Sequence, residues 1–114
     1  MVRRGASRDV HRFAEMFAAI GNEARVRIVR LLLAAHPDGL VVGDIQNELG
    51  IPGSTLSHHL DKLKQQDLVR VRRDRQYLWY TANTDSLQQL LGFLFAECCT
   101  RNRVVSAEEV IQIQ

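Results

Sequence analysis

Two groups of side chains in this chain of 114 residues have the types and spacing needed for chemistry. The first is a pair of adjacent thiols, Cys98 and Cys99, which are the only cysteines. Thiolates are soft ligands and favour thiophilic ions such as trivalent arsenic or antimony. The second group is a donor-rich polar segment at residues 51–66, followed by a basic run at residues 72–76. Because DNA phosphates and base edges accept hydrogen bonds, this group predicts a DNA-binding surface.

The segment 51–66, IPGSTLSHHLDKLKQQ, is typical of a short turn followed by a helix. Pro52 and Gly53 interrupt any preceding element, and Ser54 is predicted to cap the new helix. Three leucines at helical spacing predict its buried face. The alternative for His59 is that its ring packs under the neighbouring hairpin. The candidate DNA contacts on this helix are Ser54, Thr55, Ser57, His58, His59 and Lys62.

Beyond residue 66 the composition favours strands at residues 68–71 and 77–81, which predicts a β-hairpin. Its tip is basic, and residues 54–76 together hold six Lys or Arg and three Asp. Such a hairpin beside a helix-turn-helix is a wing, whose side chains enter or flank the minor groove. The candidate contacts on the wing are Arg72, Arg73, Arg75 and Gln76.

Apolar periodicity elsewhere predicts the helices that position these residues. Helices are expected at residues 9–20, 23–36, 42–49 and 86 to about 99, with Gly21 ending the first and Asn22 capping the second. Residues 1–8 are expected to fray, and residues 100–114 form a tail. The predicted fold is mainly α with a β-hairpin, a winged helix-turn-helix in one domain spanning residues 1–114 and well ordered from about 9 to 99.

Two stretches, GNEARVRIVRLLL and DIQNELGIPGSTLSHHLDKLKQQDLVRVRRDRQYLWYTAN, resemble the ArsR/SmtB family of small dimeric repressors over roughly residues 13–99. The resemblance implies a homodimer that binds an imperfect inverted repeat in operator DNA and leaves it when an inducer is sensed. The first and last helices are strongly apolar and are not part of the helix-turn-helix. They are therefore predicted to pair with their counterparts in a second subunit.

The chain departs from the family pattern at its usual metal sites. Val41 and Gly43 stand where many members have the two cysteines of an arsenic site. Asp85 matches the first ligand of the zinc site in the last helix, but Leu87 replaces the histidine that follows. Gly53 replaces a glutamine that is common at the start of the recognition helix, so base preference is expected to differ.

The adjacent thiols are then the candidate sensor. Neighbouring side chains on a helix diverge by about 100°, so Cys98 and Cys99 converge on one ion only if the last helix frays there. The leading hypothesis is a repressor induced by trivalent arsenic, trivalent antimony or an organoarsenical, with no permanent cofactor. The alternatives are a redox or sulfide sensor, purely structural cysteines in a metal-independent regulator, or a winged helix that binds protein in place of DNA.

Composition excludes other classes. The chain has no apolar run near the roughly 20 residues of a membrane span and no apolar core of a secretion signal. It also has no nucleophile and base at motif spacing and no phosphate-cradling glycine loop. We therefore expect a cytoplasmic protein that is not an enzyme and does not bind membranes.

Overall fold

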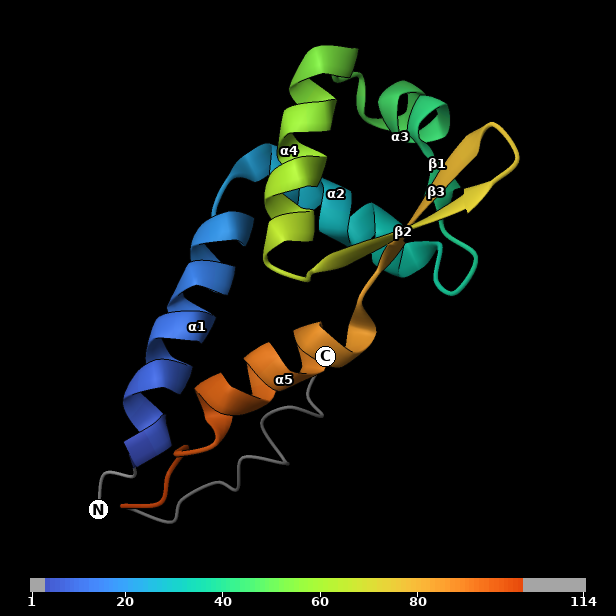
Figure 1. The fold of residues 1–114 in the computed structure, drawn as a ribbon. Helices are drawn as coiled ribbons and strands as arrows, with labels where there is room; N and C mark the ends of the chain where they lie inside the picture. Colours follow the sequence, from blue (N-terminus) through green and yellow to red (C-terminus); the bar gives the residue numbers. More distant parts are fainter. Residues whose placement is uncertain (1–3, 102–114) are drawn as a thin grey trace. The chain divides into compact units, whose positions relative to one another are not determined.

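A computed structural model describes the backbone of residues 4–101 and the side chains of residues 8–101 (Figure 1). The chain separates into two compact units, which meet between Thr84 and Asp85. The tail predicted at residues 100–114 lies almost entirely outside the described residues.

The first unit holds four helices and a small sheet. In chain order they are α1 (Arg4–Ile20), α2 (Glu23–Ala34), β1 (Leu40–Val41), α3 (Val42–Leu49), α4 (Gly53–Gln65), β2 (Val69–Asp74) and β3 (Tyr77–Ala82). The sheet is antiparallel, with strand order β1-β3-β2. The described part of the second unit consists of α5 (Thr84–Phe95) and the turns that follow it. This confirms the mainly α winged helix-turn-helix, whereas its dimerisation stays a prediction.

Several element boundaries differ from those predicted, the largest differences being at the start of α1 and the end of α5, and one strand was not predicted. Helix α1 begins at Arg4, five residues before the predicted start. Strand β1 was not predicted, since two residues cannot display a period and exist as a strand only through pairing with β3. Helix α5 ends at Phe95, four residues before the predicted end.

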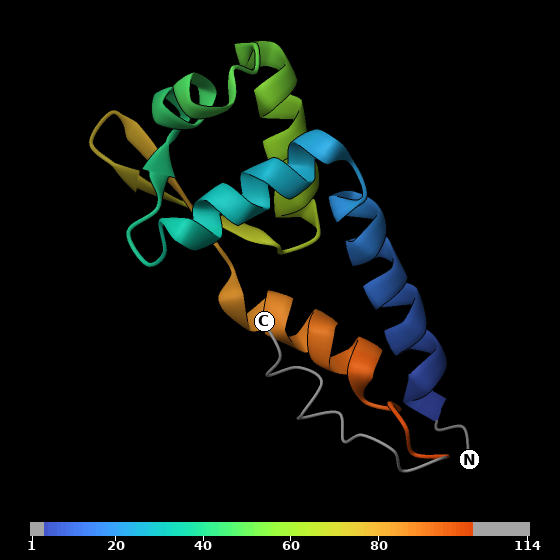
Figure 2. The ribbon, with the colours of Figure 1, turned by 180° about the vertical axis from the view of Figure 1, so that it is seen from behind.

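Helix α2 lies at the centre of the first unit, where it contacts α1, α3, α4 and β3. Figure 2 shows α2 crossing the unit from the end of α1 towards the sheet. Its buried apolar residues pack with those of its neighbours, as hydrophobic burial requires. The fully buried core side chains of this unit include Ile28, Leu32, Ile45, Leu56, Leu63 and Leu68.

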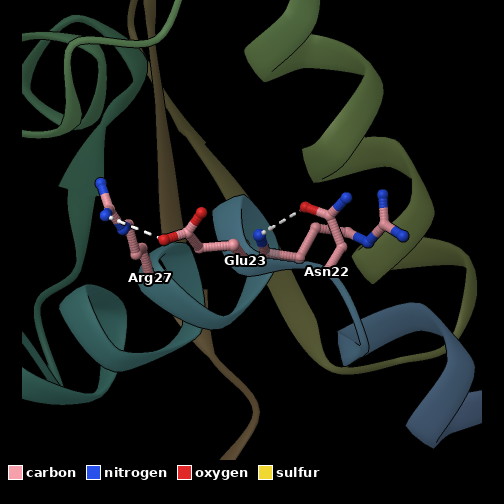
Figure 3. A network of polar contacts seen from close by, with 4 residues as sticks. Asn22, Glu23 and Arg27 are labelled. Atoms are coloured by element: carbon pink, nitrogen blue, oxygen red, sulfur yellow. Dashed lines mark hydrogen bonds and ion pairs between the residues drawn. The ribbon is translucent and has the colours of Figure 1, made fainter.

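The first turn of α2 is capped as predicted. The Asn22 side chain accepts a hydrogen bond from the backbone N–H of Arg25 at 3.2 Å, and Gly21 ends α1 (Figure 3). One turn along, Arg27 and Glu23 form an exposed ion pair at 3.2 Å. A side-chain cap of this type stabilises a helix by about 1 kcal/mol, so the corner between α1 and α2 is well defined.

The base of the hairpin is fixed by a buried asparagine. Asn83 donates its side-chain N–H to the Asp67 carbonyl at 2.8 Å and its backbone N–H to the Leu68 carbonyl at 2.9 Å. At the other edge of the sheet, just before β1, Gly39 has a φ of +82°. A Cβ at this position would collide with the Tyr80 carbonyl oxygen. Glycine at this position lets β1 approach β3 closely, which completes the sheet.

Candidate nucleic-acid interface and thiol pair

Helix α4 starts earlier than predicted. Its N-cap is Pro52, whose carbonyl accepts the Leu56 N–H at 2.8 Å, and no side chain caps it. The prediction of Ser54 as N-cap is therefore wrong. The fixed φ of proline is compatible with the start of a helix, so α4 begins before the serine. Ser54 instead lies exposed in the first turn.

The outward face of α4 carries most of the predicted contacts. The leucines at the three predicted positions, Leu56, Leu60 and Leu63, are all at most 1% exposed, which fixes the orientation of the helix. Helices α3 and α4 form the two arms of the helix-turn-helix, joined by the turn around Gly50 with a φ of +64° (Figure 1). The predicted residues that are exposed on α4 are Ser54, Thr55, Ser57, His58 and Lys62.

His59 behaves differently from its neighbours. It is only 9% exposed, and its Nδ1 lies 3.0 Å from a guanidinium nitrogen of Arg25 on α2. Burial lowers the pKa of His59, and the nearby Arg25 and His58 charges lower it further. The ring thus contacts Arg25 of α2, so we leave His59 out of the proposed contact set.

Arg25 is charged and yet partly buried. Its position explains this, because residues 25, 29 and 32 fall on one helical face. Val29 and Leu32 on that face belong to the core. The Arg25 guanidinium also donates from Nε to the Ala19 carbonyl at the end of α1.

The hairpin extends further than predicted. Arg72 and Arg73 lie within β2, and only Arg75 and Gln76 form the turn, with Arg75 at a φ of 60°. All four residues are exposed. Because successive strand residues point to opposite faces, Arg72 and Arg73 do not share one surface.

Trp79 on β3 was not singled out in the sequence, although it positions a predicted contact. It pairs with Arg72 across the strands, and the Arg72 guanidinium carbon lies 5.5 Å from the centre of its ring. An arginine over an aromatic face is held by cation–π attraction. Asp74 lies 3.9 Å from the same guanidinium. These neighbours hold Arg72 along one face of the hairpin. An arginine and a tryptophan at facing positions of the hairpin are the sequence signal for this contact.

The two thiols lie in the turns after α5, not in the helix as predicted. Cys98 donates its backbone N–H to the Phe95 carbonyl at 2.8 Å, and Cys99 has a φ of 62°. This conformation brings the two Sγ atoms to 2.6 Å from one another, and both side chains are half-buried. The hydrogen bond with Cys99 raises the pKa of the Cys98 thiol, and burial and the Cys99 charge act in the same direction.

No group of three or more His, Cys, Asp or Glu residues converges in the part of the chain that the structure describes. Within that part, the adjacent thiols therefore offer a soft site with two protein ligands. No helix among residues 4–101 is long and apolar enough to cross a bilayer.

Comparisons with known proteins agree with this architecture. A protein-family model described as a helix-turn-helix domain matches residues 20–72. The nodulation protein NolR of Rhizobium meliloti is 34% identical over 86 residues, which cover 75% of this chain and 68% of NolR. The transcriptional repressor SdpR of Bacillus subtilis strain 168 is 32% identical over 79 residues, which cover 69% of this chain and 84% of SdpR. The chain belongs to the ArsR/SmtB family of transcriptional repressors.

The fold of an ArsR-like transcriptional regulator from Rhodococcus sp. RHA1 is also similar, with a TM-score of 0.72 at 21% identity, over 91% of this chain and 95% of that regulator. Family membership makes α4 the recognition helix of a DNA-binding protein and the hairpin β2–β3 its wing.

Proposed function

We propose that this ArsR/SmtB-family protein is a homodimeric repressor that leaves its operator when a trivalent arsenical or antimonial binds Cys98 and Cys99. The observation that carries the proposal is the separation of 2.6 Å between the two Sγ atoms. On a continuous helix these side chains would diverge, whereas the turn after Phe95 directs them towards one another.

The proposed DNA contacts divide between the recognition helix and the wing. Side chains on the exposed face of α4 contact base edges and phosphates in the major groove, and those of the wing contact the backbone or the minor groove. Arg75 and Gln76, at the turn, extend furthest along the hairpin. The proposed contact set is Ser54, Thr55, Ser57, His58, Lys62, Arg72, Arg73, Arg75 and Gln76.

Exposed apolar side chains on two helices support a dimer. Val10 and Phe17, one heptad apart on α1, are 54% and 36% exposed, and Leu91 and Leu94 on α5 are 50% and 57% exposed. Large apolar side chains exposed together on a helix are typical of surfaces that associate. A dimer also presents two recognition helices to the two halves of an inverted repeat.

The proposed binding step is an exchange of oxygen for sulfur on arsenic. With phenylarsine oxide, two S–As bonds form, the As=O bond is lost and the two thiol protons leave with that oxygen as water. An organoarsenical with two exchangeable positions matches a pair of thiols, and arsenite would keep a hydroxyl as its third ligand. A change near the end of α5, a proposed interface helix, alters how the two recognition helices are oriented. A coupling of about 1–3 kcal/mol between the sites would change DNA affinity roughly 5–150-fold.

The test is a fluorescence-anisotropy titration of the protein on a labelled duplex from upstream of its own gene, under reducing conditions. Phenylarsine oxide, arsenite, antimonite, cadmium and zinc are then added separately. We expect the trivalent arsenicals and antimonite to release the wild-type protein, and Cys98→Ser and Cys99→Ser to bind DNA normally without release. Thr100→Ala changes the same turn without removing a thiol and serves as the matched control. An unchanged dose response in Cys98→Ser would rule out this sensor.

The close approach of the two sulfurs also supports a second candidate, a redox or sulfide sensor. The Cα atoms of adjacent residues are about 3.8 Å apart, whereas disulfides usually span about 4.4–6.8 Å. A bond between neighbours is therefore strained, which favours the metalloid as the primary ligand. Release by diamide or polysulfide, with no response to any arsenical, would select the redox sensor instead.

A further inference from the structure

A single guanidinium connects the first two helices of the protein to the middle of the recognition helix. Arg25 Nε donates to the Ala19 carbonyl in the last turn of α1, and an Arg25 terminal nitrogen lies 3.0 Å from His59 Nδ1 on α4. The Arg25 backbone is itself fixed, because its N–H is bonded to the Asn22 cap (Figure 3). We propose that Arg25 and His59 form a positioning clamp that sets the orientation of α4 for DNA binding.

The chemistry of the two side chains determines the protonation state that the clamp needs. Arginine only donates hydrogen bonds, so His59 Nδ1 must accept, and the ring proton must reside on Nε2. A second proton on His59 would sit on Nδ1 and face the N–H donor of Arg25. It would also place two cations, the imidazolium and the guanidinium, side by side. The clamp is therefore formed only by neutral His59.

The charged and titratable groups around His59 come from three helices. Arg25 lies on α2, and His58 on α4 has its ring centroid 6.0 Å from that of His59. Glu15 on α1 and Lys62 on α4 line, together with Arg25, a cavity of about 210 Å³ beside the clamp. Since burial and the cationic neighbours lower the pKa of His59, the neutral ring is the normal state at neutral pH. The clamp is complete above about pH 6.5 and is lost only as pH falls through the lowered pKa of His59.

The clamp supplies something that the leucines of α4 do not. Hydrophobic burial of Leu56, Leu60 and Leu63 holds the helix against the core but is not directional. A hydrogen bond is directional, and His59 is next to His58 and two residues from Ser57, both of which are exposed. A rotation of α4 about its axis would move those side chains relative to the DNA, and the bond to Arg25 opposes that rotation.

This inference rests on DNA binding by α4, and the experiment separates the two. Wild type, His59→Leu, His59→Asn and Arg25→Leu are titrated onto the same labelled upstream duplex between pH 5.5 and 8. His59→Leu and Arg25→Leu should each bind at least about fivefold more weakly at pH 7.5, the loss expected for one hydrogen bond. His59→Asn places a carbonyl oxygen where Nδ1 stood, an acceptor that does not titrate, so it should retain near wild-type affinity.

The pH profile provides the readout that a purely structural role would not change. Wild-type affinity should fall through loss of the clamp at a pH below the ordinary histidine pKa of about 6.5, and His59→Asn should remove that fall. A parallel series in a His58→Gln background removes the other imidazole on α4. His36→Gln, an exposed histidine before Pro37, is the matched control and should leave the profile unchanged. Urea denaturation verifies that each variant is folded.

The outcomes are distinct. Wild-type affinity in a folded His59→Leu variant, or a folded His59→Asn variant that is as weak as His59→Leu, would overturn the clamp while leaving DNA binding intact. Failure of the wild-type protein to bind any upstream duplex would overturn the proposed contacts and this inference together.

Discussion

The recognition helix and the thiol pair are held in opposite ways. Helix α4 is fixed by three leucines that are at most 1% exposed and by a directional bond from Arg25 to His59. Cys98 and Cys99 lie in turns beyond α5, half-buried, and their described hydrogen bonds are to one another and to the backbone nearby.

The difference fits what the proposed function asks of each region. Reading base edges requires side chains held in one orientation, and α4 is fixed by both packing and hydrogen bonding. The proposed sensor would change its local structure on binding, and segments with few buried apolar contacts change at the lowest cost. The two regions therefore differ in how firmly packing and hydrogen bonds hold them.

The largest effect should come from the packing of α4. Leu56 is fully buried, and Leu56→Ala should lower the free energy of unfolding by about 2–5 kcal/mol through lost burial and a cavity. Cys98→Ser, in the thiol segment, should change it by less than about 0.5 kcal/mol. Urea denaturation followed by circular dichroism measures both. Equal losses would mean that the thiol segment is part of the core and would remove the contrast.

The next effect concerns the wing. Arg75 lies exposed in the turn, and Arg75→Ala should weaken binding to all duplexes and reduce the slope of log affinity against log salt by about 1. Arg27→Ala removes the same charge from α2, where Arg27 is paired with Glu23, and should leave the slope unchanged. Anisotropy titrations at several salt concentrations give the slopes. If the two substitutions reduce the slope equally, the wing has no specific role.

The smallest effect tests the thiol pair directly. The hydrogen bond between Cys98 and Cys99 raises the pKa of Cys98. More of this thiol therefore stays protonated at a given pH, and the reactive thiolate forms only at higher pH. In Cys99→Ala the pKa of Cys98 should fall towards its ordinary value. The pH dependence of Cys98 alkylation by iodoacetamide, followed by mass spectrometry, should then move to lower pH. An unmoved midpoint would show that the two thiols do not interact in solution.

Local patterns were enough to predict most elements of the fold. The spacing of the leucines on α4 marks its buried face, because helical periodicity is a property of neighbouring residues. The two hairpin strands followed from composition. Strand β1 did not, since it exists only by pairing with a strand some 40 residues later: Leu40 pairs with Tyr80.

The candidate site was predictable as a set of residue types but not as a geometry. The sequence alone determined the helix-turn-helix, the basic wing, the family and the presence of one adjacent pair of thiols. Only the tertiary structure decided that His59 faces Arg25, although the two are 34 residues apart. It also decided that Arg72 and Arg73 point to opposite faces and that α5 ends before the thiols. The reason is physical: periodicity records which face of an element is apolar, whereas the partner of a polar side chain depends on contacts between elements.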